Sequence, residues 1–460
     1  MDRRVGSATP IIPFLRASLV LLACVAHLAC GPGGVDTTTG TDPSTADPTT
    51  DPATTGSTTV DATTVGPTTD DSSDSTQSTT ATDPGPLCGD GDVDRGEDCD
   101  DGNDVNGDGC NNDCVESASQ LWEFRSDEGG AFYSVAVAED GTIFAGGSKD
   151  LGRWFARFSA DGALEADAFY PSAGSLEIIL DLAVTPEAVY AVGDVTAELD
   201  FRDLWLAQLD YDGAIVWEDV HDSGFGPDWG NRVALTDDGG IIVAGRASVE
   251  DATVGTITRR FDLDGALEWS EETAPGVGQD TFSLGPGLAL AGGDVVVGTS
   301  LAVDDGYPGY LVTYSAQGGA PLSTQEYTED VFIMGLAADP SGDLLSIGSV
   351  AQSFVVHRRT SDGQPVWTSD ACLGSTGRDI VIDSQGDIVV VGYGEGQNNT
   401  NVRLCKLTPE GALRWGLDID GGVGDDLAYS LAIAEGDVIL VAGGLRGDGQ
   451  TDAWLAAYAP

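Results

Sequence analysis

The sequence predicts an all-β protein: a seven-bladed β-propeller closed by an N-terminal strand and preceded by a small disulfide-rich module and a disordered tether. Three observations lead to this prediction. An apolar run that ends on glycine recurs seven times between residues 118 and 460, at spacings of 44 to 53 residues. Each repeat holds four short β-prone runs separated by turn residues. Four strands at a period of about 40–50 residues are typical of a propeller blade.

Two landmarks define each repeat. The first is the glycine that ends the apolar run, which gives Gly146, Gly193, Gly245, Gly298, Gly348, Gly392 and Gly443. The second is a turn, most often Asp-Gly, that precedes another strand and is a hairpin signal. In four repeats a tryptophan follows this turn glycine by four residues, namely Trp217, Trp269, Trp367 and Trp415. We expect these indoles to pack between blades rather than to form a carbohydrate platform.

The two ends of the repeat array complement each other. The last repeat stops at Pro460, before its expected fourth strand, and an unmatched run at 121–124 (LWEF) precedes the first repeat. Donation of this run to the last blade would close the ring and cover both sheet edges. The array, residues 118–460, resembles the β-propeller repeats of bacterial secreted proteins, which carry an Asp-x-x-Gly turn before the apolar run and Asp-Gly-x-x-x-Trp after it.

Residues 1–29 have the layout of a signal peptide. A basic start is followed by an apolar run at 17–29, which is shorter than the ~20 residues that span a bilayer. The run ends in Ala-Cys30-Gly and resembles a bacterial lipoprotein signal, which implies lipidation of Cys30. Cys24, preceded by Leu-Leu-Ala, is the alternative lipidation site. An ordinary cleaved signal without lipid is the remaining alternative.

Residues 30–86 form the predicted tether. From 31 to 86 there are 19 threonines and no Lys, Arg, Leu, Ile or aromatic residue, so no core can form. A coil of this length spans ~40 Å on average. The tether would therefore hold the folded part clear of a membrane.

Residues 87–117 form a cysteine-rich module, with four cysteines at Cys88, Cys99, Cys110 and Cys114. A segment this short and polar cannot fold by burial alone. In an exported chain the four cysteines predict two disulfides, with three connectivities open and a zinc site as the rival. The runs around Cys88, Cys99 and Cys110 (CGDG, GEDCDDGN, GDGC) resemble the Myxococcus-type cysteine-rich repeat. That resemblance implies a disulfide module on a surface protein and no reaction.

The same module contains half of a calcium-loop pattern. Asp104, Asn106 and Asp108 match the oxygen ligands of Asp-x-[Asp/Asn]-x-[Asp/Asn]-Gly. The twelfth position is Val115 instead of glutamate, so we do not expect an EF-hand. A looser calcium site and a solvated acidic turn remain the two interpretations, and calcium is the one cofactor that the sequence indicates.

The charge of the chain restricts its partners. There are 76 acidic and 20 basic residues, which gives a formal net charge of −56. Nucleic-acid binding requires a basic surface, so we exclude nucleic acid as a partner. Adsorption to anionic lipid is disfavoured for the same reason. We expect a monomer that contacts the membrane through its lipid anchor only.

An aspartate precedes the first strand of several repeats, namely Asp228, Asp280, Asp330 and Asp426. That position borders the central channel of a propeller. A partial carboxylate ring there could hold a cation or a basic ligand, and the alternative is that each aspartate caps a turn. The segments that follow the glycine landmarks vary in sequence and should emerge together on one face, where propellers bind.

Two cysteines, Cys372 and Cys405, lie in neighbouring repeats. A bridge requires Cα atoms within ~7 Å. Because the sequence does not place them so closely, we expect two separate buried thiols rather than a disulfide.

No Ser/His/Asp arrangement, HExxH motif or phosphate loop occurs, and the chain has three histidines. We therefore expect a non-enzymatic binding or scaffold protein of the cell envelope, at the outer membrane or cell surface. Its partner would be an envelope or extracellular protein or glycan. The alternatives are an enzyme resembling the quinone-dependent dehydrogenases and an outer-membrane assembly lipoprotein. The dehydrogenases typically have eight blades and a basic cofactor pocket, whereas basic residues are scarce here.

Overall fold

The structure is a computed structural model. It describes residues 88–460 except 95–96, 173, 197–201, 250–252, 274–285, 301–307, 331, 351–352, 397–398 and 448. The chain divides between Thr79 and Thr80, and all described residues belong to the second unit, Thr80–Pro460. The predictions for residues 1–86, including Cys24 and Cys30, and the prediction for Asp280 lie outside the described residues.

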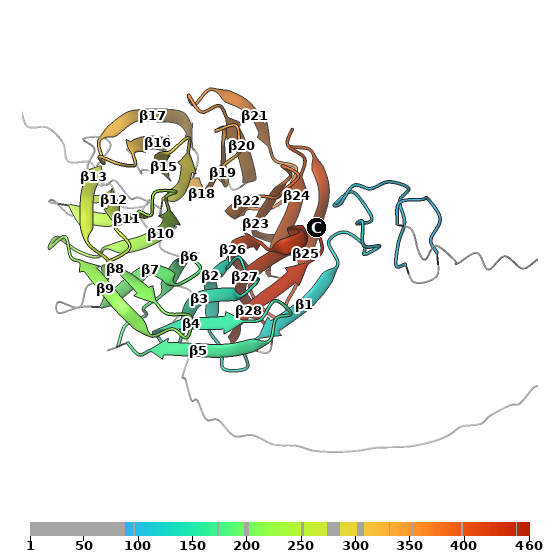
Figure 1. Cartoon of the computed structure of the whole chain (residues 1–460), viewed down its shortest axis with the longest axis horizontal. Coiled ribbons are helices and arrows are strands. Elements are labelled where there is room, and N and C mark those ends of the chain that lie inside the picture. Colours follow the sequence, from blue (N-terminus) through green and yellow to red (C-terminus); the bar gives the residue numbers. More distant parts are fainter. Residues whose placement is uncertain are drawn as a thin grey trace, which may run out of the picture. The chain divides into compact units, whose positions relative to one another are not determined.

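The second unit contains seven four-stranded antiparallel sheets arranged around an axis, which confirms the predicted propeller (Figure 1). The first strands of the blades lie near the axis and the fourth strands lie at the periphery (Figure 1). The strands are β1 (Gln120–Arg125), β2 (Ala131–Val137), β3 (Ile143–Lys149), β4 (Gly152–Phe158), β5 (Leu164–Tyr170), β6 (Ile179–Val184), β7 (Val189–Thr196), β8 (Arg202–Leu209), β9 (Ile215–His221), β10 (Trp229–Leu235), β11 (Ile241–Val249), β12 (Thr253–Phe261), β13 (Leu267–Thr273), β14 (Gly287–Ala291), β15 (Asp294–Ser300), β16 (Pro308–Ser315), β17 (Pro321–Asp330), β18 (Phe332–Ala338), β19 (Leu344–Val350), β20 (Ser353–Arg359), β21 (Pro365–Ser369), β22 (Thr376–Ile382), β23 (Ile388–Glu395), β24 (Thr400–Leu407), β25 (Leu413–Ile419), β26 (Leu427–Ile433), β27 (Ile439–Arg446) and β28 (Thr451–Tyr458). One short 3-10 helix, η2 (Glu435–Asp437), lies between β26 and β27.

Closure by the N-terminal strand is confirmed. Blade 7 has the strand order β1-β28-β27-β26, so its fourth strand comes from the opposite end of the chain. The strands β1 and β28 are antiparallel, with Trp122 opposite Ala457 and Phe124 opposite Leu455. This pairing leaves no blade with three strands and therefore covers the sheet edges that the chain ends would otherwise expose.

The core lies between adjacent blades. The second and third strands are buried on both faces, as in the run Ile388–Gly392 of β23, whereas the fourth strands alternate between exposed and half-buried residues. This difference explains why the sequences of the second strands are continuous apolar runs, whereas the sequences of the fourth strands alternate between apolar and polar residues.

The fourth-strand tryptophans pack against the turn of the next blade, as expected for inter-blade residues. The indole Nε1 of Trp217 donates to the Leu263 carbonyl at 3.3 Å, and Trp269 and Trp367 make the equivalent bond to the blade that follows each of them. The turn glycine lies under the ring: Gly265 has a φ of 86°, and a Cβ there would lie 2.8 Å from the Trp217 ring. Glycine is therefore required at these turns both by conformation and by space.

Trp415 departs from this pattern. Its buried Nε1 has no hydrogen-bond partner among the described residues. The reason is topological. In blade 7 the third and fourth strands belong to opposite ends of the chain, so no hairpin turn exists there to supply the carbonyl.

The expectation of two separate thiols in the propeller was wrong. Cys372, which follows β21 of blade 5, is bonded to Cys405 in β24 of blade 6, with an S–S distance of 2.01 Å and a Cα–Cα distance of 5.9 Å. The two cysteines are 33 residues apart in sequence, and only the packing of one blade on the next brings them together.

The module is held by two disulfides, Cys88–Cys114 and Cys99–Cys110, which selects one of the three open connectivities. Its centre is polar. The Asp100 carboxylate accepts hydrogen bonds from four backbone amides, those of Gly89, Asp90, Gly91 and Gly102, at 2.8 to 3.1 Å. Desolvation acts to raise the pKa of Asp100, but these amides outweigh it and hold the pKa below its usual value.

Among the described residues no helix is long and apolar enough to span a bilayer.

Candidate functional site

The connections between second and third strands leave each blade at the same end as those between fourth and first strands, because neighbouring strands run antiparallel. We call this end the loop face. It contains the segments 194–203, 222–228, 246–254, 300–309, 393–401, 420–426 and 445–452. The observed strand order therefore agrees with the expectation that the variable segments share one face. Several residues of these segments lie outside the described part of the chain.

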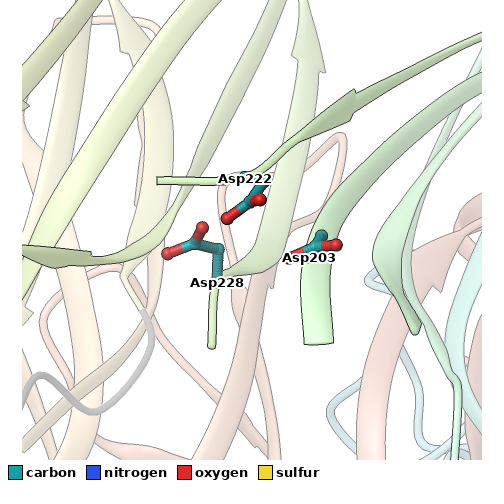
Figure 2. Close-up of side chains that lie close together, drawn as sticks. All are labelled: Asp203, Asp222 and Asp228. Atoms are coloured by element: carbon teal, nitrogen blue, oxygen red, sulfur yellow. The ribbon is translucent and has the colours of Figure 1, made fainter. Parts of the chain in front are cut away.

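Three carboxylates meet on the loop face between blades 2 and 3 (Figure 2). Asp203 is the second residue of β8, Asp222 directly follows β9, and Asp228 directly precedes β10. One oxygen from each lies within 4.8 Å of the other two. Asp203 is 4% exposed and Asp228 is 0% exposed, whereas Asp222 is open to solvent. We call this group the aspartate triad.

Asp228 fixes the loop that carries the triad. Its Oδ2 accepts a hydrogen bond from the backbone amide of Ser223 at 2.6 Å, and its Oδ1 accepts one from the amide of Ser248 at 2.7 Å. Burial raises the pKa of Asp228, and these amides act in the opposite direction. The loop 222–228 is thereby attached to β11 of the following blade.

Asp203 differs from Asp228 because its buried carboxylate has no hydrogen-bond or ion-pair partner in the described part of the chain. Burial, followed by the negative charges of Asp222 and Asp228, raises its pKa to about 6. The nearby Arg202 pairs instead with Asp194, at 3.1 Å.

Blade 6 contains a second copy of the loop with one difference. Residues 420–426 repeat the pattern Asp-x-Gly-x-Gly-x-Asp of residues 222–228. Asp426 accepts the amides of Gly421 and Arg446 at 2.6 and 2.7 Å, as Asp228 does in its own loop. The second residue of β24 is Asn401, where β8 has Asp203. This repeated loop pattern could have identified Asp222 from the sequence, whereas Asp203 lies outside the pattern and has an asparagine as its counterpart in blade 6.

The predicted channel carboxylates are therefore placed as follows. Asp228 and Asp426 are both 0% exposed, and each uses both oxygens to accept backbone amides, which is the turn-capping arrangement. Asp330 is the last residue of β17. Within the described residues, the carboxylates grouped with Asp228 are Asp203 and Asp222 rather than those of the other blades.

The middle of the axis is occupied by a different polar network. Arg232 of β10 extends to the Asp379 carboxylate at 3.4 Å and to the Met334 carbonyl at 3.1 Å. Asp181 of β6 accepts the Ser134 hydroxyl at 3.1 Å and the Val233 amide at 2.9 Å. Burial raises the pKa of Asp181 to about 6, although Arg232 acts to lower it. Side chains from opposite blades thus join across the axis.

A tilted pair of tyrosine rings lies beside this network. The rings of Tyr133 in β2 and Tyr429 in β26 are 4.5 Å apart between centroids, and the Arg378 guanidinium lies 5.6 Å from the Tyr429 ring. Burial raises the pKa of both tyrosines. The inner strands therefore contact one another through aromatic as well as charged groups.

The half calcium loop of the module has its own hydrogen bonds. The Asn106 Oδ1 accepts the Asn112 amide at 2.8 Å, and Asp108 accepts the Asn103 side-chain amide at 3.4 Å. Asp104 is exposed. Among the described residues of the module, no three His, Cys, Asp or Glu side chains gather closely enough to hold an ion. Calcium binding at Asp104, Asn106 and Asp108 remains a prediction.

No protein-family model and no curated protein sequence matches the chain. Solved structures do resemble it. The WD40 β-propeller domain of Doa1 is 11% identical, with a TM-score of 0.50, over 74% of this chain and 96% of that domain. The polysaccharide lyase Uly1 is also 11% identical, with a TM-score of 0.50, over 74% of this chain and all of that one. At this identity the likeness establishes the propeller fold alone, which is compatible with a binding or scaffold role.

Proposed function

We propose that the protein is a non-enzymatic binding or scaffold protein, anchored in the cell envelope, that presents the loop face of an acidic propeller to an envelope or extracellular protein or glycan. The observation that carries this proposal is a difference between two parts of the propeller. Side chains link the blades across the axis, whereas carboxylates gather on the loop face. Arg232 and Asp379 are linked across the axis, whereas the aspartate triad lies on the loop face. Loops held on a rigid scaffold are the usual binding surface of this fold.

The partner is tested by affinity capture from envelope and extracellular extracts with the full chain. Asp370 and Glu395 are exposed acids on the loop face, and Asp237 and Asp264 are exposed acids at the opposite end. The loop-face variant Asp370→Lys/Glu395→Lys should lose the captured partner, and Asp237→Lys/Asp264→Lys should retain it. Equal capture by both variants would contradict binding at the loop face.

The anchor is tested by metabolic labelling with a palmitate analogue. The wild-type chain should carry the label, and Cys30→Ser should abolish it. Label that survives in Cys30→Ser and disappears in Cys24→Ser would move the lipidation site to Cys24. An unlabelled wild-type chain would remove the anchor from the proposal. The enzyme alternative is tested separately, since a purified dehydrogenase of the quinone class would show quinone absorbance.

A further inference from the structure

We propose that Asp203, Asp222 and Asp228 form a calcium site on the loop face between blades 2 and 3. The first argument is charge. One oxygen from each of the three carboxylates lies within 4.8 Å of the other two, and no lysine or arginine of the described residues forms an ion pair with them; His221 is the basic side chain that acts on Asp228. Two of the three are buried. A buried carboxylate normally has a partner, and a divalent cation supplies one for all three.

The second argument is the unpartnered side chain. Asp203 is 4% exposed and accepts no hydrogen bond, so both of its oxygens are available within the triad. By contrast, Asp418, on β25 next to Asn401, accepts the side-chain amide of that asparagine at 2.8 Å. Asp203 has no such side-chain partner among the described residues, whereas the strand in blade 6 pairs its carboxylate with a neutral amide.

The third argument is geometry and ligand type. Calcium binds oxygen ligands at about 2.3–2.6 Å, so ligands on opposite sides of the ion are about 4.6–5.2 Å apart. One oxygen from each of the three carboxylates lies within 4.8 Å of the other two, close enough for one such ion to contact all three. Magnesium requires a shell about 1 Å narrower, and zinc prefers nitrogen and sulfur ligands. Carboxylate oxygens are the ligands that calcium prefers, so the ligand type favours calcium over zinc.

The oxygens that remain free are sufficient to begin a coordination shell. Asp203 offers two oxygens. Asp222 accepts the Gly224 amide with Oδ1 at 2.7 Å and retains its other oxygen. The Asp228 oxygens each accept one amide and retain a second lone pair. Water on the open side at Asp222 would complete the shell.

The ion would connect parts of two blades. Asp203 belongs to β8, the loop 222–228 links blades 2 and 3, and Asp228 ties that loop to Ser248 of β11. Bound calcium would therefore fix this part of the loop face. The site requires neither the lipid anchor nor a macromolecular partner, so it stands independently of the proposed function.

The experiment uses the full chain, freed of metal with a chelator and titrated with Tb³⁺, which replaces calcium and emits when a nearby tryptophan is excited. Trp229, the neighbour of Asp228, is the expected donor. Bound Tb³⁺ should be displaced by Ca²⁺ at lower concentration than by Mg²⁺. Asp203→Asn and Asp222→Asn, which preserve side-chain shape, should each weaken binding at least tenfold, and Trp229→Phe should reduce emission without loss of calorimetric Ca²⁺ binding.

Two control variants separate this site from its rivals. Asp420→Asn changes the matching position of the blade 6 loop and should leave binding unchanged, as should Asp104→Asn/Asp108→Asn in the module. Wild-type affinity in Asp203→Asn and Asp222→Asn would overturn the proposal. Loss of all Ca²⁺ binding in Asp104→Asn/Asp108→Asn would overturn it as well and assign the ion to the module. Circular dichroism of each variant verifies that the propeller is folded.

Discussion

The indole Nε1 of Trp122 donates a hydrogen bond to the carbonyl oxygen of Ala160 over 3.2 Å, and this contact joins the last blade to the first. The ring of Trp122 covers Gly162, where a Cβ would lie 2.4 Å from the indole. The same arrangement recurs within the array between Trp217 and Leu263. The strand that closes the ring therefore makes the same inter-blade contact as a strand in the interior of the array.

Trp122→Ala should destabilise the propeller about as much as Trp217→Ala, by ~2–3 kcal/mol, because both indoles are half-buried and make the same turn contact. Denaturant unfolding of both variants measures this. Substitutions this close to the start of a domain are normally tolerated, so a Trp122→Ala variant as stable as the wild type would contradict the closure contact.

A cross-link provides the control for the same strand. Glu123 lies opposite Ala456 in the β1–β28 register, so Glu123→Cys/Ala456→Cys should form a disulfide. Glu123→Cys/Thr313→Cys, with the second cysteine in blade 4, should not. A fully stable fragment that lacks residues 118–127 would also contradict closure.

The disulfide Cys372–Cys405 should stabilise the propeller by ~4 kcal/mol, because it closes a loop with a sequence separation of 33. Cys372→Ala/Cys405→Ala should lower the free energy of unfolding by about that amount. A non-reducing peptide map should recover the two peptides as one linked species. Two free thiols from the propeller, titrated in denaturant without reductant, would disprove the bridge.

Arg232→Met should lower stability by ~3 kcal/mol at pH 7.5, because it leaves the Asp379 carboxylate without its cation on the axis. It should also raise the pKa of Asp181 further above about 6, since Arg232 acts to lower it. A raised native pKa means that the native state binds more protons than the unfolded chain above pH 4. The loss should therefore be smaller at pH 5 than at pH 7.5. Arg125→Met, which removes a surface pair with Glu123, should cost less than ~1 kcal/mol at both pH values.

The effect of Asp203→Asn on the free energy of unfolding should change sign when calcium is added. The native pKa of Asp203 is about 6 and its ordinary value is 3.8, so the wild-type protein without calcium loses stability as pH rises from about 4 to 6. In chelator at pH 7.5 the variant should be more stable by ~1 kcal/mol, since water near Asp222 screens part of the repulsion. At pH 4 the two proteins should be equal.

In saturating calcium the order should reverse, because the wild type gains ~2.7 kcal/mol at a hundredfold excess over Kd. Thermal unfolding with and without calcium, at pH 4 and pH 7.5, makes both comparisons. A variant that is less stable than the wild type in chelator at pH 7.5 would show that Asp203 is partnered without an ion.

Asn401→Asp should create a second ion site. The blade 6 loop already holds Asp420 and Asp426 in the spacing of Asp222 and Asp228, and it lacks the third carboxylate. Calorimetry should therefore find one more Ca²⁺ bound than in the wild type. An unchanged stoichiometry would show that the loop pattern and a third carboxylate are together insufficient.

The sequence by itself determined the number of blades, the four-strand unit and the closing strand. These features follow local patterns that repeat along the chain: the glycine landmarks, the Asp-Gly turns, and the tryptophan-bearing fourth strand, of which the run 121–124 (LWEF) with Trp122 is one copy. Local turn chemistry and side-chain alternation are properties of neighbouring residues, so they can be recognised in the sequence without knowledge of the fold.

The tertiary structure decided the contacts between units that are not neighbours in sequence. Cys372 meets Cys405 because blade 5 packs on blade 6, and Arg232 meets Asp379 because strands from opposite blades converge on the axis. Asp203 joins Asp228 through the side-by-side placement of β8 and the loop before β10. The distances between such residues depend on blade packing and on strand register. Neither of these produces a periodic pattern or a motif in the sequence.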